Sequence, residues 1–139
     1  MEMPTALVSL CIDPRLNHEL LRIQVAQHLR RLNLHAERIY LVNDVGGNVS
    51  TSFEHALDLL VRQGQAPVFA AVLHHDDCLA EGAGLRAPMA VTALEIGNRL
   101  SAHGLNCPVH SGHILTETNH LIWDQSPDPQ YRPYEAIAL

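Results

Sequence analysis

The chain has 139 residues, of which 47% are hydrophobic and 17% charged, so it can bury the core of one ordinary domain. A net charge of -6, counted with neutral histidines, disfavours nucleic acid as a partner, because phosphate binding needs a basic face. Three cysteines do not make a disulfide framework, and neither a signal peptide nor a bilayer-spanning run is expected. We therefore expect one domain over residues 1–139 of a cytoplasmic protein with reduced thiols and no membrane contact.

The chain begins with a predicted buried strand followed by a helix. Residues 6–12 form a short, nearly continuous apolar run, which is typical of a parallel strand buried on both faces. The Asp13-Pro14 dipeptide ends this run, and Asn17 is a suitable N-cap for a helix that reaches residue 32. We expect the inward side of this helix to consist of Leu20, Leu21, Ile23, Val25, Ala26 and Leu29.

The same alternation continues through the middle of the chain. Residues 38–42 and 67–74 are the next predicted strands, and the second of these is strongly apolar. Between them lie a Gly-rich loop over 43–50 and a helix over 51–63. A loop rich in His, Asp and Gly follows over 75–85.

The last part of the chain predicts a helix over 88–103 and then a strand or hairpin over 108–115 and 120–123. The tail from about Gln125 is rich in Pro and Tyr, and we expect it to be extended or part of a subunit interface. This alternation of strands and helices indicates an α/β fold with a central, mainly parallel sheet flanked by helices, whose sites lie beyond the carboxyl ends of the strands. The inward side chains of the last helix are expected to be Val91, Leu94, Ile96 and Leu100. Three histidines are expected on the solvent-facing surface: His28, His35 and His55.

A candidate metal site involves the ends of two predicted strands. His75 and Cys78 are three residues apart, a spacing that lets one tight turn place both around a metal ion. Cys11 closes the first strand and can supply a third ligand, which leaves a fourth position open as in catalytic zinc sites. The alternative is a chance His-x-x-Cys with Cys11 as a buried core thiol. Because side chains alternate along a strand, only one of His74 and His75 is expected to be a ligand.

A charged pair follows Cys11 at intervals of two residues. On an extended segment this spacing keeps the side chains of Cys11, Asp13 and Arg15 on one side. The guanidinium would hold Asp13 ionised and fix its orientation beside a metal. A surface Asp-Pro turn with a solvated Arg15 is the alternative.

Two motifs, in this order, resemble those of the β-class carbonic anhydrases. Residues 11–15 resemble the family's Cys-x-Asp-x-Arg signature, and residues 75–78 resemble its His-x-x-Cys. Between them, Val45-Gly46-Gly47, then a helix and a strand, are similar in order to the family's Asn-Ala-Gly-Gly block, helix and strand. Residues 108–110, followed by Gly112, resemble the strand near the family's end. The resemblance covers roughly residues 6–123 and is closest to the short bacterial and archaeal branch.

The resemblance implies a fold of the β-carbonic anhydrase type and one zinc ion per chain, held by Cys11, His75 and Cys78. It implies that Asp13 orients zinc-bound hydroxide or caps the metal, and that Arg15 holds Asp13. The reaction would be the reversible hydration of CO2 to bicarbonate and a proton. The expected assembly is a homodimer or a higher even-numbered homo-oligomer.

The expected substrate pocket is where this chain departs from the family pattern. The family's Arg-Asn-Ala-Gly is here Asn43, Asp44, Val45 and Gly46, and the usual Gly after the second Cys ligand is Leu79. A narrower or less cationic pocket favours an alternative small neutral substrate, so carbonyl sulfide or carbon disulfide hydrolysis on the same scaffold is a second hypothesis. A non-catalytic zinc-binding relative is a third.

Overall fold

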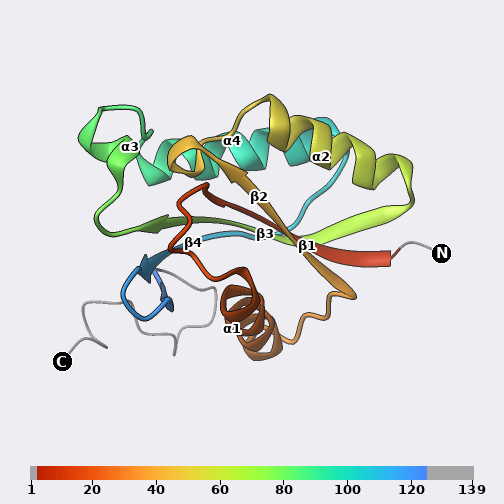
Figure 1. The fold of residues 1–139 in the computed structure, drawn as a ribbon. Helices are drawn as coiled ribbons and strands as arrows, with labels where there is room; N and C mark the ends of the chain where they lie inside the picture. The colour runs from red at the N-terminus through yellow and green to blue at the C-terminus, as the bar shows by residue number, and fades with distance from the viewer. Residues whose placement is uncertain (1–2, 125–139) are drawn as a thin grey trace.

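A five-stranded sheet of order β2-β1-β3-β4-β5 forms the centre of the protein, whose residues 3–124 are described by a computed structural model (Figure 1). The first four strands in this order run parallel, and β5 is antiparallel to β4. The predicted α/β class with a mainly parallel sheet is therefore confirmed, whereas the predicted tail from about Gln125 lies outside the described residues. The strands are β1 (Met3–Cys11), β2 (Arg38–Asp44), β3 (Gln65–His75), β4 (Val109–Leu115) and β5 (His120–Trp123).

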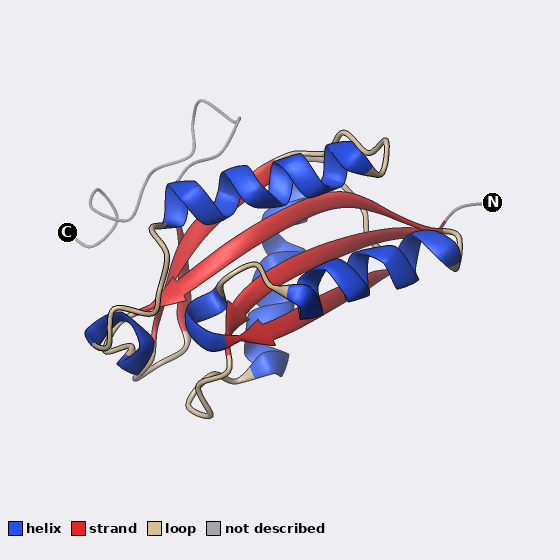
Figure 2. Cartoon of the chain, turned by 90° about the horizontal axis from the view of Figure 1, so that it is seen from above, coloured by secondary structure: helices blue, strands red, loops and turns tan. Residues whose placement is uncertain are grey.

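Helices cover both faces of the sheet. Helix α1 lies on one face, and α2 and α4 lie side by side on the other (Figure 1, Figure 2). The helices are α1 (His18–Arg31), α2 (Thr51–Arg62), α3 (Leu79–Gly82) and α4 (Met89–Ala102), with a 3-10 turn η1 (Val45–Gly47) after β2. Within residues 3–124, no helix is long and apolar enough to cross a membrane.

The two faces of the sheet bury separate apolar clusters because side chains alternate along each strand. On β1, Val8 belongs to the cluster under α1, whereas its neighbour Leu7 packs with Phe53 of α2 and Ile96 of α4. Seven consecutive residues of β1 are buried, as expected for a central parallel strand. The C-terminal ends of β1 and β3 are thereby held between the apolar cluster under α1 and the cluster under α2 and α4.

Helix α1 begins where the sequence predicts, since the Asn17 side chain accepts a hydrogen bond from the Leu20 backbone N–H at 3.1 Å. The prediction of which residues face inward is partly wrong, because the side chains of Leu20 and Ile23 are 44% and 51% exposed. The buried stripe instead contains Leu21, Val25, His28 and Leu29, which lie on one face at helical spacing.

The prediction that His28 faces solvent is also wrong. Its Nε2 lies 2.9 Å from Nδ1 of His110, and its ring stacks on Trp123 with centroids 3.9 Å apart. These polar and aromatic contacts on the sheet accommodate a buried imidazole. Burial lowers the pKa of His28 to about 3, which keeps the ring neutral at physiological pH.

Helix α4 is rotated relative to the expected orientation in a similar way. Ile96 and Leu100 are buried as predicted, but Val91 and Leu94 are 45% and 66% exposed. Thr92 is buried in their place, four residues before Ile96, and its hydroxyl donates to the carbonyl of Pro88. Its polar group is thus satisfied within the helix, so a threonine fits the inward stripe.

Gly112 of β4 and Gly97 of α4 provide a test of how closely β4 packs against its neighbours. A Cβ on Gly112 would lie 3.0 Å from the Ile122 carbonyl oxygen and 3.3 Å from Leu73, whereas a Cβ on Gly97 of α4 would meet no heavy atom within 4 Å. We expect Gly112→Ala to lower the free energy of unfolding by about 1–3 kcal/mol through overpacking. Gly97→Ala is the matched control and should leave stability unchanged or raise it by up to ~1 kcal/mol. Urea unfolding measures both, and equal effects would contradict the close packing of Gly112 against β5.

Candidate metal centre

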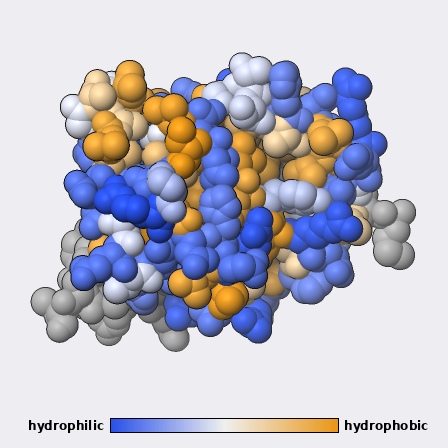
Figure 3. All heavy atoms as spheres, in the orientation of Figure 1, coloured by the Kyte–Doolittle hydropathy of each residue, from blue (hydrophilic) through white to orange (hydrophobic). Residues whose placement is uncertain are grey.

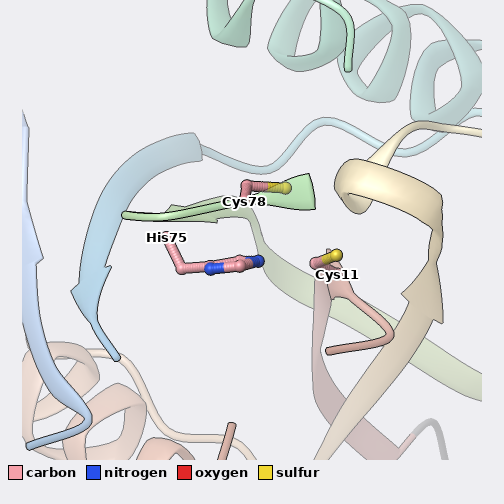
Figure 4. Close-up of side chains that lie close together, drawn as sticks. All are labelled: Cys11, His75 and Cys78. Atoms are coloured by element: carbon pink, nitrogen blue, oxygen red, sulfur yellow. The ribbon is translucent and has the colours of Figure 1, made fainter. Parts of the chain in front are cut away.

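The parallel pairing of β1 with β3 brings the predicted metal-binding side chains together. Cys11 is the last residue of β1 and His75 the last of β3, and Cys78 follows three residues later at the start of α3. All three side chains are buried, and one possible ligand atom of each lies within 4.8 Å of the others. The His75 ring and the two sulfur atoms point toward a common space (Figure 4).

The tautomer of His75 follows from its hydrogen bonding. Its Nδ1 lies 2.7 Å from the carbonyl oxygen of Asp76, and since a carbonyl only accepts, Nδ1 carries the proton. The lone pair is therefore on Nε2, which is buried and has no hydrogen-bond partner among residues 3–124. A backbone carbonyl that binds the second imidazole nitrogen is the usual support of a histidine ligand to a metal.

Cys11, His75 and Cys78 together form a donor set that fits a zinc ion. In a tetrahedral site, zinc–ligand distances of about 2.0–2.3 Å place ligand atoms roughly 3.4–3.8 Å apart, so closing this group around an ion needs only small side-chain rotations. The buried lone pair of His75 Nε2 has no hydrogen-bond partner among the described residues, which costs free energy. A metal ion bound to this nitrogen would remove that cost. The role of Cys11, His75 and Cys78 as metal ligands remains a prediction that this geometry fits.

Asp13 and Arg15 form a two-pronged ion pair next to the three side chains. The Arg15 Nε and terminal nitrogen donate to Oδ1 and Oδ2 of Asp13 at 3.0 and 2.7 Å, and the Arg15 backbone N–H also donates to Oδ1 at 2.9 Å. Hydrogen bonding from Arg15 lowers the pKa of the Asp13 carboxyl to about 2, although burial acts in the opposite direction. Oδ2 lies 3.8 Å from Nε2 of His75, so the carboxylate borders the metal-binding group.

Arg15 also holds the loop that carries two of the candidate ligands. Its terminal nitrogens donate to the Asp77 carboxylate at 3.1 Å and to the Asp77 backbone carbonyl at 2.8 Å. Asp76 fixes the other side of this loop, because its carboxylate accepts from the backbone N–H and the hydroxyl of Thr116 at 2.7 and 2.9 Å. Asp77 itself has a positive φ of 54°, so the loop turns tightly between His75 and Cys78.

Sequence reasoning did not identify Arg86 as a support of this loop. Its side chain is largely buried, donates to the His75 carbonyl at 3.1 Å and pairs with Glu81 at 2.8 Å. Gly46 makes room for it, because a Cβ at Gly46 would lie 2.9 Å from Cβ of Arg86, and Gly46 has a φ of +64°. The Gly-rich segment after β2 therefore serves close packing around the candidate centre.

An apolar pocket of about 460 Å³ opens beside Cys11 and Asp13. Of its described lining residues, Asp13 alone is charged. Large exposed apolar side chains surround it, and Leu79 is the most exposed of them at 83%. Figure 3 shows apolar atoms gathered over this end of the molecule, around α3. The pocket lining consists of Cys11, Ile12, Asp13, Pro14, Val45, Leu79, Ala80, Ala83 and Leu85.

The five residues predicted for a substrate pocket are divided by the structure. Val45 and Leu79 line the apolar pocket, and Asn43, Asp44 and Gly46 are not among its lining residues. The Asp44 carboxylate accepts from the Val45 backbone N–H at 2.8 Å and from the hydroxyl of Ser50, so it caps the turn η1. Its negative charge is thus engaged in local structure.

His74 does not belong to the group of possible ligands. Alternation along β3 directs it away from His75, and its ring lies 6.5 Å from that of His113 on the neighbouring strand. Burial lowers the pKa of His74 to about 4, so the imidazole is neutral near pH 7.

Comparisons with known proteins support the fold but not a family assignment. No family model matches the chain. No curated protein sequence matches it either. A solved apo form of a carbon disulfide hydrolase is 14% identical over 96% of this chain and 82% of its own, with a TM-score of 0.50. That likeness shows a shared fold.

Carbonic anhydrases are also among the structural neighbours. The enzyme of Streptococcus mutans is 16% identical over 85% of this chain and 80% of its own, with a TM-score of 0.48. β-carbonic anhydrase isoform I of Trichomonas vaginalis is 10% identical over 85% and 80%, with a TM-score of 0.49. Membership of the β-carbonic anhydrase family, and of its bacterial and archaeal branch, remains a prediction from the motifs.

The ion pair of Asp13 predicts how stability depends on pH. Because the pKa of Asp13 is lower in the folded protein than its ordinary value of 3.8, the stabilisation is present above about pH 4 and is lost as pH falls toward 2. In the presence of a chelator, we expect Asp13→Asn to flatten the fall in the free energy of unfolding between pH 5 and 2.5. Asp58→Asn, which removes a surface partner of Arg62, is the control. Identical pH profiles for the Asp13 variant and the wild type would contradict the ion pair.

Proposed function

We propose that the protein is a zinc lyase that catalyses the reversible hydration of CO2 to bicarbonate and a proton. The observation that carries this proposal is the buried lone pair of His75 Nε2, which faces two buried thiols beside the Asp13–Arg15 pair. Cys11, His75 and Cys78 would hold one zinc ion. When bound, such an ion acts as a Lewis acid that makes a nucleophilic water available at neutral pH.

The hydrogen bonds of Asp13 define what it can do in this reaction. Oδ1 accepts two hydrogen bonds from Arg15, which uses both of its lone-pair sites. Oδ2 accepts one, and this oxygen is the one that lies near His75. With a pKa of about 2, the carboxylate is too weak a base to hold a proton at neutral pH. Asp13 therefore orients the reacting water by accepting a hydrogen bond from it, and a buffer molecule or a nearby histidine takes up the proton.

The apolar pocket supports a neutral substrate. Its walls include Ile12, Val45, Leu79 and Leu85, so a small uncharged molecule can enter without losing hydrogen bonds to water. Carbonyl sulfide and carbon disulfide are also small and uncharged. Because Leu79 lines this pocket at the position where the family pattern has Gly, their hydrolysis is the second candidate function. We also propose a homodimer or a larger even-numbered assembly. In it, a second subunit would cover the exposed apolar side chains around the pocket, which are Ile12, Val45, Leu79 and Leu85.

Zinc binding is the first test of the proposal. We expect about one zinc ion per chain in the purified protein, and almost none in Cys78→Ser, because a hydroxyl is a poor replacement for a thiolate ligand. Cys107→Ser is the matched control, since Cys107 lies outside the group of possible ligands. Zinc can be quantified by mass spectrometry after gel filtration. Stoichiometric zinc in Cys78→Ser would contradict the ligand assignment.

Hydration of CO2 is the second test, measured by stopped flow with a pH indicator. We expect the wild type to catalyse the reaction and Asp13→Asn to keep zinc while losing about 10²-fold or more in kcat, because an amide presents one acceptor oxygen and no charge. Asp58→Asn should retain the wild-type rate.

The outcomes separate the candidate functions. An unchanged rate in Asp13→Asn would refute the role of its carboxylate. Release of hydrogen sulfide from carbonyl sulfide, without CO2 hydration, would favour the second candidate. Zinc-loaded protein that is inactive on both substrates would indicate a non-catalytic zinc-binding protein.

A further inference from the structure

The turn between β4 and β5 contains a buried asparagine that contacts the segment after the Asp13–Arg15 pair. Asn119 is 8% exposed and has a φ of +57°. Asparagine is one of the few residues other than glycine that tolerate this left-handed conformation. A glycine would meet the backbone requirement equally well, so the conformation alone does not account for the amide side chain.

The Asn119 side chain binds two backbone groups that are more than 100 residues away in the sequence. Its Oδ1 accepts from the Asn17 N–H at 2.7 Å, and its Nδ2 donates to the Arg15 carbonyl at 3.0 Å. Nδ2 also lies 3.4 Å from the Thr116 carbonyl, within the same turn. One amide thus fixes both ends of the three-residue segment from Arg15 to Asn17, between the ion pair and helix α1.

Gln24 of α1 strengthens this connection from the other side. Its Nε2 donates to the Asn119 carbonyl at 2.7 Å, and its Oε1 accepts from the Leu121 backbone N–H at 2.7 Å. The turn cannot move away from α1 without breaking these bonds together with those of the Asn119 side chain. Breaking any one of these partly buried hydrogen bonds is costly, because it leaves an unsatisfied polar group while the others still hold the two segments together.

The same turn also holds the loop with the candidate metal ligands. Thr116 donates from its backbone and its hydroxyl to the Asp76 carboxylate, and Asp76 directly follows His75. The β4–β5 turn therefore contacts the His75–Cys78 loop through Thr116 and the segment from Arg15 to Asn17 through Asn119. These two contacts tie the Arg15 backbone and the His75–Cys78 loop to the same turn, and the Arg15 guanidinium also binds that loop directly through Asp77.

We propose that Asn119 is a positioning residue that acts through Arg15 to place the Asp13 carboxylate at the metal centre. This proposal rests on the proposed function for its catalytic consequence. The physical basis is that the Arg15 side chain is 43% exposed, and an exposed ion pair is weakened by the entropy that holding a long side chain in one geometry costs. Anchoring its backbone carbonyl restricts the base of the side chain, so the two-pronged contact with Asp13 costs less conformational entropy.

Two substitutions test this role. Asn119→Gly keeps the left-handed backbone and removes both side-chain hydrogen bonds, whereas Asn119→Asp keeps the acceptor for the Asn17 N–H and loses the donor to the Arg15 carbonyl. The matched control is Asn33→Gly. Asn33 has a φ of 56° at an exposed turn, and its side chain makes no hydrogen bond within residues 3–124.

The first measurement is the solvent exchange of the Arg15 Nε–H group, followed by NMR of the full-length, zinc-loaded protein labelled with nitrogen-15. We expect this exchange to be about tenfold faster in both Asn119 variants and unchanged in Asn33→Gly. Zinc content should stay at the wild-type level in all three, because no ligand is altered. If Asn119→Gly fails to fold, the Asp variant carries the test.

The second measurement is the rate of CO2 hydration. We expect about a tenfold loss in kcat in Asn119→Gly with little change in KM, because small displacements of a catalytic group act mainly on the chemical step. In an Arg15→Ala background, the same substitution should cost less than about twofold, since Asn119 would have no guanidinium to position.

Two results would overturn the proposal. One is an Arg15 exchange rate that is equal to the wild type in both Asn119 variants, and the other is a full tenfold loss that persists in the Arg15→Ala background. If the wild type itself hydrates no CO2, the proposed function fails, but the exchange measurement still decides whether Asn119 positions Arg15.

Discussion

The parallel pairing of β1 with β3 is the constraint on which the whole candidate centre depends. These strands occupy the middle of the sheet and are covered on both faces, so their ends cannot separate without exposing two apolar clusters. Leu10 is thereby paired with Leu73, two residues before β3 ends at His75. From this pairing follow the approach of Cys11 to His75 and the place of Asp13 beside them. The buried lone pair of His75 Nε2 has no hydrogen-bond partner among the described residues, and a metal ion that bound the two thiols as well would satisfy it.

Beyond the strand ends, polar contacts from distant segments determine the shape of the site. Arg15, Arg86 and Thr116 each bind a different point of the His75–Cys78 loop. The loop contains a left-handed Asp77, a conformation that costs free energy and persists only where its surroundings determine it. Supports of this kind resemble the outer contacts that orient metal ligands in proteins generally. These contacts restrict the candidate ligand side chains, and such restriction lowers the entropic cost of binding an ion.

Much of this arrangement could be predicted from local patterns. Apolar runs located the strands, and the Asn17 side chain located the start of α1, because both signals depend on neighbouring residues. The proximity of Cys11 to the His75–Cys78 loop followed from the rule that parallel strand ends meet. The rotation of α1 could not be predicted this way, since Leu20 and Ile23 are as apolar as the buried Leu21, Val25 and Leu29, and the newly buried residue is the polar His28. His28 is buried because Trp123 and His110 receive it, and these partners come from the far end of the chain. Arg86 and Asn119 were missed for the same reason, because a single sequence gives no sign of which backbone groups they reach.

The electrostatics of the apolar pocket connect these structural features to the choice of substrate. The Asp44 carboxylate, which replaces a neutral residue of the family pattern, is engaged with Val45 and Ser50 and is not among the pocket lining residues. Arg15 directs its guanidinium to Asp13, the one charged residue among the described lining residues, and Arg86 directs its own to the His75–Cys78 loop. A neutral molecule thus meets no unpaired charge on entering, whereas an anion finds no cation among the described lining residues. Such a pocket suits the uncharged substrate of the proposed hydration and offers its anionic product no cation that would retain it.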